Sequence, residues 1–230
     1  LGRAQPARAR GGASQPRPGD VNLCFCFVLV PPYFHLLAGP TGAGKSTLYK
    51  ALLAQGLVDV ACEFVNADLY ERDHLQHMTE PQARSEAART WADTRRASLL
   101  AQGASFASET VFSHESKLPL IRNAQQAGFV VALYVVALDD PQRLLARVRQ
   151  RVREGGHPVP PDKILSRYPR TLAHLAHAVH LADVAYLFDA SEIEDGGPWL
   201  VAICAEGQVV QRFEPLPQWA HTVLSGNHLL

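Results

Sequence analysis

Apolar residues follow two spacings along this chain, and the two spacings alternate. Continuous apolar runs are typical of strands buried on both faces, whereas apolar residues three or four positions apart are typical of amphipathic helices. The strand candidates are YFHLLAG, ACEFVNAD, ASFASETVF, FVVALYVVAL and AYLFDAS. Because helical patterns lie between them, the chain is predicted to have an α/β fold, with a parallel sheet covered by helices on both faces.

Helical spacing is most regular between Glu80 and Gly103, where Ala83, Ala87 and Trp91 lie four residues apart. Further helices are predicted over KSTLYKALLAQG, KLPLIRNAQQAG and DPQRLLARVRQRVREGG. After the last strand candidate, WLVAICAEGQVVQRFEP has the pattern of a C-terminal β-hairpin that turns at its Glu-Gly pair. Parallel sheets of this kind bind ligands at the carboxyl ends of their strands, so functional residues are expected just after strands.

Composition separates a short leading segment from the rest of the chain. Residues 1–32 begin with a stretch rich in Arg, Pro, Gly and Ala that cannot form a core, so they are expected to be disordered or a non-native extension. Residues 33–230 are expected to form a single domain. The apolar run LCFCFVLV is too short to span a bilayer, and a signal peptide is disfavoured because its cleavage zone would fall against the next strand.

The balance of charges limits the classes of partner to be expected, and the cysteine content indicates the redox state of the compartment. Lys plus Arg equals Asp plus Glu at 22 each, so no global field indicates nucleic acid or a membrane surface as the partner. The four cysteines have neither Cys-x-x-Cys spacing nor the density of a disulfide scaffold, which is typical of free thiols in a reducing compartment. A cytoplasmic location is therefore expected.

A glycine-rich loop, GPTGAGKST, lies between the first strand candidate and the first helical segment. It fits the pattern G-x-x-x-x-G-K-[ST], in which backbone N–H groups and a helix N-terminus bind a polyphosphate. Lys45 is expected to neutralise the β- and γ-phosphates of ATP, and Ser46 to bind Mg²⁺. The fold is therefore expected to be of the P-loop NTPase or kinase type. The residues expected to contact ATP are Gly39, Thr41, Gly42, Ala43, Gly44, Lys45, Ser46, Thr47 and Arg151.

Two other strand candidates end in polar residues on the expected ligand side. Asp68 ends EFVNAD, where a carboxylate can act as general base and take the proton of an acceptor hydroxyl. The alternative is that Asp68 caps the next helix. Glu109 and Thr110 end ASET, where they are expected to bind the acceptor, the alternative being a loop cap.

Positive charge is concentrated between Arg143 and Arg170, where eight Arg or Lys residues stand against two acidic ones. Arginines recur every four residues from Arg143 on one helix face, and the following REGGHPVPPDKILSRYPR has the Gly and Pro content of a mobile flap. We predict a basic lid over about residues 143–170, in which Arg167 and Arg170 act on the charge of the transferred phosphoryl group. The alternative is a solvated face. Asp189, after the fifth strand candidate, is expected to touch the nucleotide, anchor this lid or cap a turn.

Several of these motifs occur together and in the same order in a known family. Over about Tyr33 to Ser191 the chain resembles the zeta toxin family, in particular its short predicted-kinase branch. The motifs that carry the resemblance are GPTGAGKST, NAD, SET, RVRQRVREGGHPVP, ILSRYPR and YLFDAS. The resemblance implies a P-loop kinase fold in which ATP phosphorylates a sugar hydroxyl of a UDP-N-acetyl amino sugar. It also implies a small antitoxin protein as a partner.

The same resemblance implies roles for single residues. Lys45 and Ser46 would hold ATP and Mg²⁺, and Asp68 would be the base. Glu109 would contact the sugar. Arg167 and Arg170 would clamp phosphate and are, with Lys45 and Asp68, the expected catalytic residues.

Other functions of a phosphate loop leave marks that this sequence lacks. A guanine-nucleotide switch needs an Asn-Lys-x-Asp reader, and a transporter-type ATPase needs a Leu-Ser-Gly-Gly-Gln-like sequence, although VVALDD imitates the strand of such an ATPase. The sequence therefore favours an ATP-dependent small-molecule kinase that phosphorylates an alcohol. The alternative is a P-loop ATPase or a nucleotide-binding regulatory module without a small-molecule acceptor.

Overall fold

The computed structural model describes residues 30–154, 159–194 and 197–226. By its internal contacts the chain divides into residues 1–30 and residues 31–230, and the fold is that of the second unit. Among the described helices, none combines the length and the apolar character that crossing a bilayer requires.

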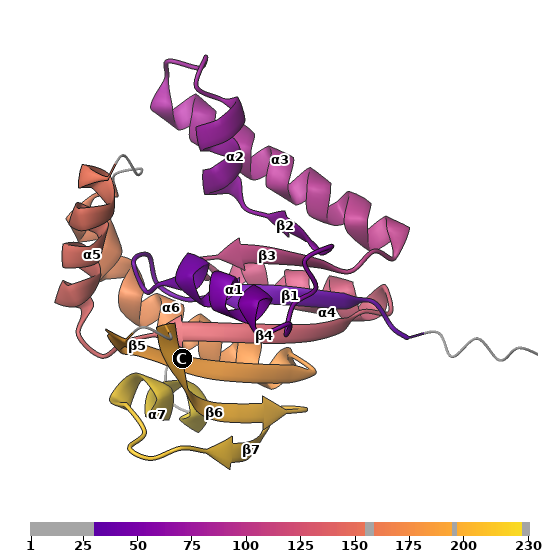
Figure 1. Cartoon of the computed structure of the whole chain (residues 1–230), viewed down its shortest axis with the longest axis vertical. Coiled ribbons are helices and arrows are strands. Elements are labelled where there is room, and N and C mark those ends of the chain that lie inside the picture. The colour runs from indigo at the N-terminus through magenta and orange to yellow at the C-terminus, as the bar shows by residue number, and fades with distance from the viewer. Residues whose placement is uncertain (1–29, 155–158, 195–196, 227–230) are drawn as a thin grey trace, which may run out of the picture. The chain divides into compact units, whose positions relative to one another are not determined.

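One seven-stranded sheet organises the unit (Figure 1). Along the sheet its strands are β2 (Glu63–Val65), β3 (Phe106–Thr110), β1 (Tyr33–Ala38), β4 (Val130–Ala137), β5 (Val184–Glu194), β6 (Gly197–Ala205) and β7 (Gln208–Arg212). The first five run parallel, and β6 and β7 are added antiparallel at the β5 edge. The predicted parallel sheet and the C-terminal hairpin are therefore confirmed.

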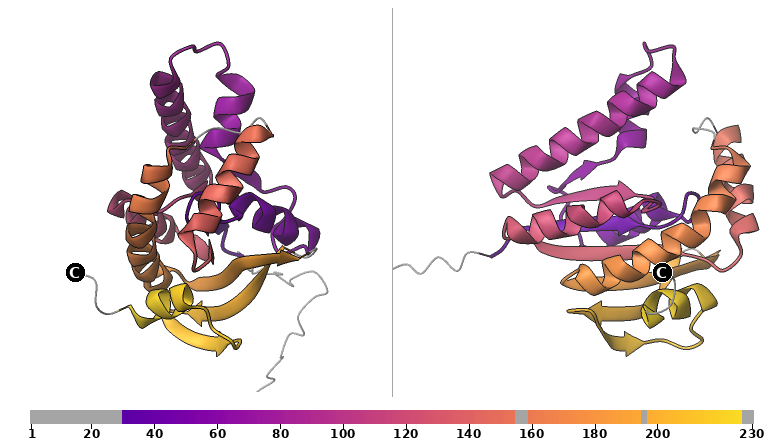
Figure 2. Two further views of the ribbon diagram at one scale, coloured as in Figure 1. Left: turned by 90° about the vertical axis from the view of Figure 1, so that its left-hand side faces the viewer. Right: turned by 180° about the vertical axis from the view of Figure 1, so that it is seen from behind.

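Helices cover both faces of the sheet, as predicted (Figure 2). One face carries α1 (Lys45–Ala54) and α5 (Pro141–Arg153), and the other carries α3 (Pro81–Gln102), α4 (Leu118–Gln126), α6 (Pro161–Leu181) and α7 (Gln218–Ser225). Alternate residues of β1 serve the two layers, because Leu36 packs in the cluster under α3, α4, α6 and α7, while Leu37 packs under α1 and α5. Both clusters are closed to solvent, so the loops at the strand ends stand on a rigid base.

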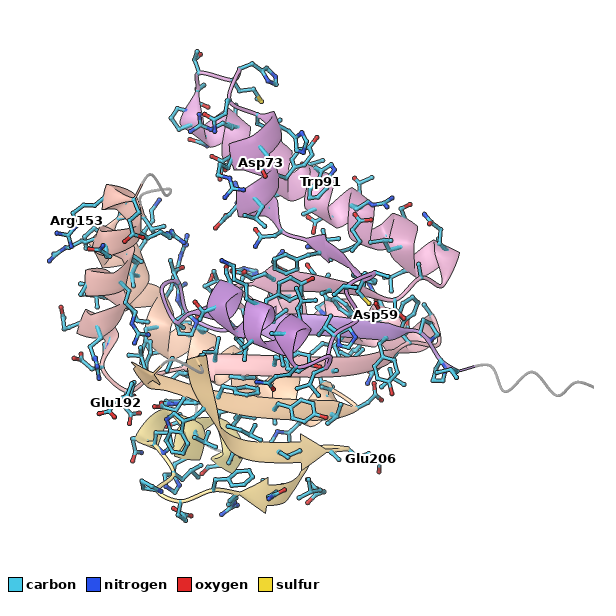
Figure 3. The ribbon with its side chains drawn as sticks, in the orientation of Figure 1. Asp59, Asp73, Trp91, Arg153, Glu192 and Glu206 are labelled. Atoms are coloured by element: carbon cyan, nitrogen blue, oxygen red, sulfur yellow. The ribbon has the colours of Figure 1, made fainter. Side chains whose placement is uncertain are left out.

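Besides α7, two further short helical segments were not predicted from the sequence. The first, α2 (Ala67–His74), begins directly after β2 with Asn66 as its N-cap, whose side chain accepts a hydrogen bond from the Leu69 amide. Tyr70 of α2 stacks on Trp91 of α3 with the ring centroids 3.9 Å apart, so the two helices form one hairpin beside β2 (Figure 3). The second is the 3-10 turn η1 (Glu115–Lys117), which leads into α4.

The prediction of a mobile flap is wrong for the second half of that segment, because residues 161–170 are helical. Helix α6 begins at Pro161, because proline at the first helical position loses no backbone hydrogen bond and has a suitable φ. Ile164 on its first turn is buried with α1 and α5, which holds this turn against the domain. Arg167 and Arg170 therefore lie on a helix that contains Pro169, and not on a loop. Residues 155–158, at the centre of the predicted flap, lie outside the described residues.

Candidate active site

The phosphate loop occupies the carboxyl end of β1, and its shape depends on glycine. Gly39 has φ +152°, and a Cβ added there would lie 2.0 Å from the carbonyl oxygen of Val136 on β4. Gly42 has φ +84°, and a Cβ there would lie 2.9 Å from the carbonyl oxygen of Leu144 on α5. Gly44, with φ +103°, is the N-cap of α1. Any side chain at these positions would change the path of the loop.

Lys45 and Ser46 contact the carboxylate of Glu109, which lies near the end of β3, the strand paired with β1. The Lys45 ammonium, only 5% exposed, donates to the carbonyl oxygens of Gly39 and Pro40 at 3.1 Å each and lies 3.5 Å from Oε1 of Glu109. Oε2 of Glu109 accepts from Ser46 Oγ at 3.2 Å. Glu109 thus balances the buried charge of Lys45 and touches the start of α1.

Glu109 also joins the loop to α2. The same Oε2 accepts from Nδ2 of Asn66 at 3.0 Å. The side-chain oxygen of Asn66, Oδ1, accepts from the Leu69 amide and caps α2. The sequence predicted that Glu109 would face an acceptor, and the structure places it between the phosphate loop and the start of α2, at the wall of a cavity. Asn66 was missed, although it opens the NAD motif, because its amide was not considered as a donor.

A cavity of about 620 Å³ opens at the carboxyl ends of β2 and β3. It is bounded by α2, α3, the segment from β3 to α4, and α6. Five residues that the sequence predicted for catalysis or acceptor binding line it, namely Asp68, Glu109, Thr110, Arg167 and Arg170. They come from three separate parts of the chain, so the fold brings together what the sequence keeps apart.

Asp68 lies in the first turn of α2, two residues after the cap. The alternative that Asp68 itself caps this helix is wrong, because Asn66 makes the capping bond. Asp68 is exposed at the cavity, where its carboxylate has no hydrogen bond to any of the described residues. A carboxylate in this position has its lone pairs available to a ligand hydroxyl.

Four cations around this cavity form no ion pair within the described part of the chain: Arg89, Lys117, Arg167 and Arg170. A fifth, Arg96, is 7% exposed and donates to Asp93 and to Ser108 Oγ, the latter at 3.1 Å. Ser108 in turn donates to the Val65 carbonyl oxygen at 2.8 Å, which ties α3 to β2 and β3. The sequence analysis overlooked Arg89, Arg96 and Lys117, because no motif marks them.

Helix α5 packs against the phosphate loop from the other side. Leu144 and Val148 are the α5 residues nearest Gly42, and Arg151 follows on the same helix face at spacing three from Val148. Arg151, predicted to contact ATP, therefore lies about one turn beyond Val148, and it does not line the cavity. Thr47, also predicted to contact ATP, has its methyl group next to Gly197 of β6.

The donor atoms present suit Mg²⁺. Ser46 Oγ and the Glu109 carboxylate are neighbouring oxygen ligands at the N-terminus of α1, and hard divalent cations take oxygen ligands. Bound there beside the phosphates, Mg²⁺ would neutralise the charge of a triphosphate.

A second cavity, of about 650 Å³, lies over the amino-terminal parts of β1, β4 and β5 and extends to β6. Rings of β1, β4 and β5 stand in a row across its floor: Tyr33 and His35 at 5.6 Å, His35 and Tyr134 at 6.0 Å, and Tyr134 and Tyr186 at 5.4 Å between centroids. Burial lowers the pKa of His35 and raises that of Tyr134. None of the residues predicted for the active site lines this aromatic cavity.

Comparison with protein families gives one match. The family described as AAA domain matches residues 34–175, which include the phosphate loop, Asp68, Glu109, Arg167 and Arg170. Among curated proteins no sequence match was found.

Solved structures with the same fold include two of the AvrRxo1-ORF1:AvrRxo1-ORF2 complex and one of a chromosomal toxin–antitoxin system. A chain of the AvrRxo1-ORF1:AvrRxo1-ORF2 complex with sulphate ions has a TM-score of 0.63 at 20% identity, covering 86% of this chain and 65% of that chain. The AvrRxo1-ORF1:-ORF2 structure with ATP gives 0.59 at 22% identity, covering 77% and 60%. The PezAT chromosomal toxin–antitoxin system of Streptococcus pneumoniae gives 0.56 at 13% identity, covering 84% and 82%.

These similarities confirm the P-loop kinase fold expected from the zeta toxin resemblance. This chain spans less than two thirds of the length of the AvrRxo1 chains that it matches.

Proposed function

This chain belongs to the AAA domain family, and from that premise we propose that it is an ATP-dependent small-molecule kinase. It transfers the γ-phosphate of ATP to a hydroxyl group of an acceptor that binds in the 620 Å³ cavity. The observation that carries the proposal is the position of Glu109, which contacts both Lys45 and Ser46 of the phosphate loop and also lines the cavity that holds Asp68. Donor and acceptor sites are thus adjacent.

In the proposed reaction the loop amides and Lys45 hold the β- and γ-phosphates, and Ser46 with Glu109 would hold Mg²⁺, which would neutralise phosphate charge. The acceptor hydroxyl lies between Asp68 and the γ-phosphorus. Asp68 takes the hydroxyl proton as the oxygen attacks in line and ADP leaves. Arg167 and Arg170, which line the cavity without an ion-pair partner among the described residues, stabilise the charge on the transferred group.

The acceptor that we propose is a UDP-N-acetyl amino sugar, on the strength of the zeta toxin resemblance. The cavity supports an acceptor of this class, because its volume suits a molecule of that size and its unpaired cations suit an anionic one. A small antitoxin protein is proposed as a partner, since the PezAT neighbour is part of a toxin–antitoxin system. A cytoplasmic location remains the expectation from the cysteine content.

Phosphate transfer can be tested directly with a panel of acceptors. The protein is mixed with ATP, Mg²⁺ and UDP-sugars, free sugars or nucleosides, and products are identified by mass. The expected result is a phosphorylated acceptor formed together with ADP. Equal ATP consumption with and without acceptor would identify an ATPase instead, and lack of ATP binding would contradict both functions.

Asp68→Asn tests the base in the same assay. Removing the proton acceptor should lower turnover by about 10²-fold while ATP binding persists. Asp73→Asn is the matched control, because Asp73 lies on the same helix, pairs with Arg72 and does not line the cavity. Full activity of Asp68→Asn would remove Asp68 from the mechanism.

A further inference from the structure

A buried carboxylate within β5, opposite the last residue of β4, is held by helix α7. Asp189 is 2% exposed, and its Oδ1 accepts from the indole Nε1 of Trp219 on α7 at 2.7 Å. The same carboxylate accepts from the backbone N–H of Ser191 at 2.9 Å and from Ser191 Oγ at 3.2 Å. Three donors therefore fix the backbone from Asp189 to Ser191.

Helix α7 is attached to the end of β4 as well. The Asp139 carboxylate, just after β4, accepts from the backbone N–H groups of Gln218 at 3.1 Å and Trp219 at 2.6 Å. Trp219 itself is 1% exposed. The helix thus links the segment just after β4 to Asp189 of β5, which pairs with the last residue of β4, close to the edge of the sheet at which the phosphate loop lies.

The backbone that Asp189 fixes is the acceptor for an arginine. The carbonyl oxygen of Ala190 accepts from Nη2 of Arg147 at 2.6 Å. The other terminal nitrogen, Nη1, is buried and has no partner among the described residues. Arg147 precedes Val148 and follows Leu144 by three residues, so it lies on the part of α5 that packs against Gly42 of the phosphate loop. A buried donor without a partner is costly, and a phosphate oxygen would satisfy it.

We propose that Arg147 binds the nucleotide phosphates and that Trp219 is a positioning residue for it, acting through Asp189 and the Ala190 carbonyl group. The inference rests on the proposed function, because ATP bound at the loop supplies the phosphate. By this inference α7, which lies far in sequence from the phosphate loop, contributes to nucleotide binding. Burial, joined by the charge of Arg143, lowers the pKa of Arg147, and Asp189 opposes that shift, consistent with Asp189 as its balancing charge.

The test is a double-mutant cycle on ATP affinity, measured with a fluorescent ATP analogue in the absence of acceptor and well below the unfolding temperature. Trp219→Phe keeps an aromatic ring and removes the indole N–H together with part of the ring system, and Trp91→Phe controls for that loss of ring. It should weaken binding about fivefold, as expected for one hydrogen bond of about 1 kcal/mol, and Arg147→Ala should weaken it about tenfold. In the Arg147→Ala background, Trp219→Phe should have less than a twofold effect, because its route to the nucleotide is gone.

A purely structural role for Trp219 would give the same loss of affinity in both backgrounds, and that result overturns the proposal. Unchanged affinity of the Trp219→Phe single variant also overturns it. Trp91→Phe on α3 is the matched control and should leave ATP affinity unchanged.

Steady-state kinetics distinguishes a failure of this inference from a failure of the proposed kinase function. Trp219→Phe should raise KM for ATP and leave KM for the acceptor unchanged. If the wild-type protein phosphorylates an acceptor while Trp219→Phe matches it, this inference alone fails. A wild-type protein that binds no ATP removes the proposed function and this inference with it.

Discussion

Two cavities described above are nearly equal in volume, about 620 and 650 Å³; one lies at the carboxyl ends of β2 and β3, the other over the amino-terminal parts of β1, β4 and β5. The cavity at the carboxyl ends is lined by carboxylates, hydroxyls and guanidinium groups. The cavity at the amino ends is lined by stacked aromatic and aliphatic side chains. Volume alone would not distinguish them, and the larger one is remote from the phosphate loop.

The difference follows from what each end of the sheet is made of. At the carboxyl ends, loops and first helical turns present free backbone N–H groups and capping side chains, which charged ligands can use. At the amino ends, side chains such as Tyr134 and Tyr186 still belong to strands, and their backbone groups are taken by neighbouring strands. Reactive chemistry is therefore expected at the first cavity and only packing energy at the second.

The sharpest test of that division is at Gly39. Gly39→Ala would place a Cβ against the Val136 carbonyl oxygen and should lower the free energy of unfolding by about 3 kcal/mol or more. Gly128→Ala is the control, because it also has positive φ but meets nothing within 4 Å, so a cost of only about 1–2 kcal/mol is expected. Urea unfolding measures both. Equal losses would mean that the loop tolerates a side chain.

Lys45→Ala should abolish function at the carboxyl edge without unfolding the domain. Loss of the ammonium that we propose to bind the phosphates should lower turnover by about 10²-fold. Lys50→Ala, an exposed position on the same helix, should keep full turnover. Phosphate transfer to the acceptor, followed by mass, gives the rates. Loss of activity in both variants would point to a fault in α1 as a whole.

Arg170 lines the first cavity and Tyr186 the second, so we expect substitution of Arg170 to affect mainly turnover and substitution of Tyr186 mainly stability. Arg170→Met should lower turnover about tenfold and change the free energy of unfolding by less than about 0.5 kcal/mol. Tyr186→Leu should lower the free energy of unfolding by about 1–2 kcal/mol and leave turnover within about twofold of wild type. Each variant is assayed for both quantities. A large activity loss in Tyr186→Leu would show that the aromatic cavity takes part in the reaction.

The smallest expected effect is a pH dependence at His35. Burial lowers its pKa in the folded protein, so the unfolded chain binds the proton more readily. Its contribution to stability is therefore complete above the ordinary histidine pKa of about 6.5 and is lost as the pH falls below that value. The free energy of unfolding of His35→Gln, measured between pH 5 and pH 8 by urea titration, should fall less with acid than that of wild type. Parallel curves would contradict a buried neutral imidazole.

Much of the fold could be predicted because local patterns and the final structure agree. The helix expected from Glu80 to Gly103 is α3, with Glu80 as N-cap and Gly103 as C-cap. The Glu-Gly turn lies between β6 and β7, with both residues at positive φ. In such segments periodicity, caps and turn residues all act within a few positions.

The site was only partly predictable, because its contacts join distant segments. Asp68 and Glu109 could be placed at strand ends from their position after apolar runs. The bonds from Glu109 to Asn66 and Ser46 span 43 and 63 residues, and no periodicity reports them. Gly and Pro content misassigned the start of α6, since Pro161 begins a helix there. Trp219 gave no sequence signal, because its partner Asp189 is 30 residues away.

Pro169 lies inside α6 and removes one hydrogen bond from the backbone of that helix. Proline has no amide hydrogen, so the carbonyl group of Leu165 receives no helical hydrogen bond from residue 169. Across this turn the helix is joined by one bond fewer than elsewhere, and its bending stiffness is lowest there. Arg167 lies just before this compliant point, and Thr171, fully buried, lies just after it. Because Ile164 before this point and Thr171 after it are both buried, the helix is held on both sides of the missing bond, and Arg167 keeps its place at the cavity.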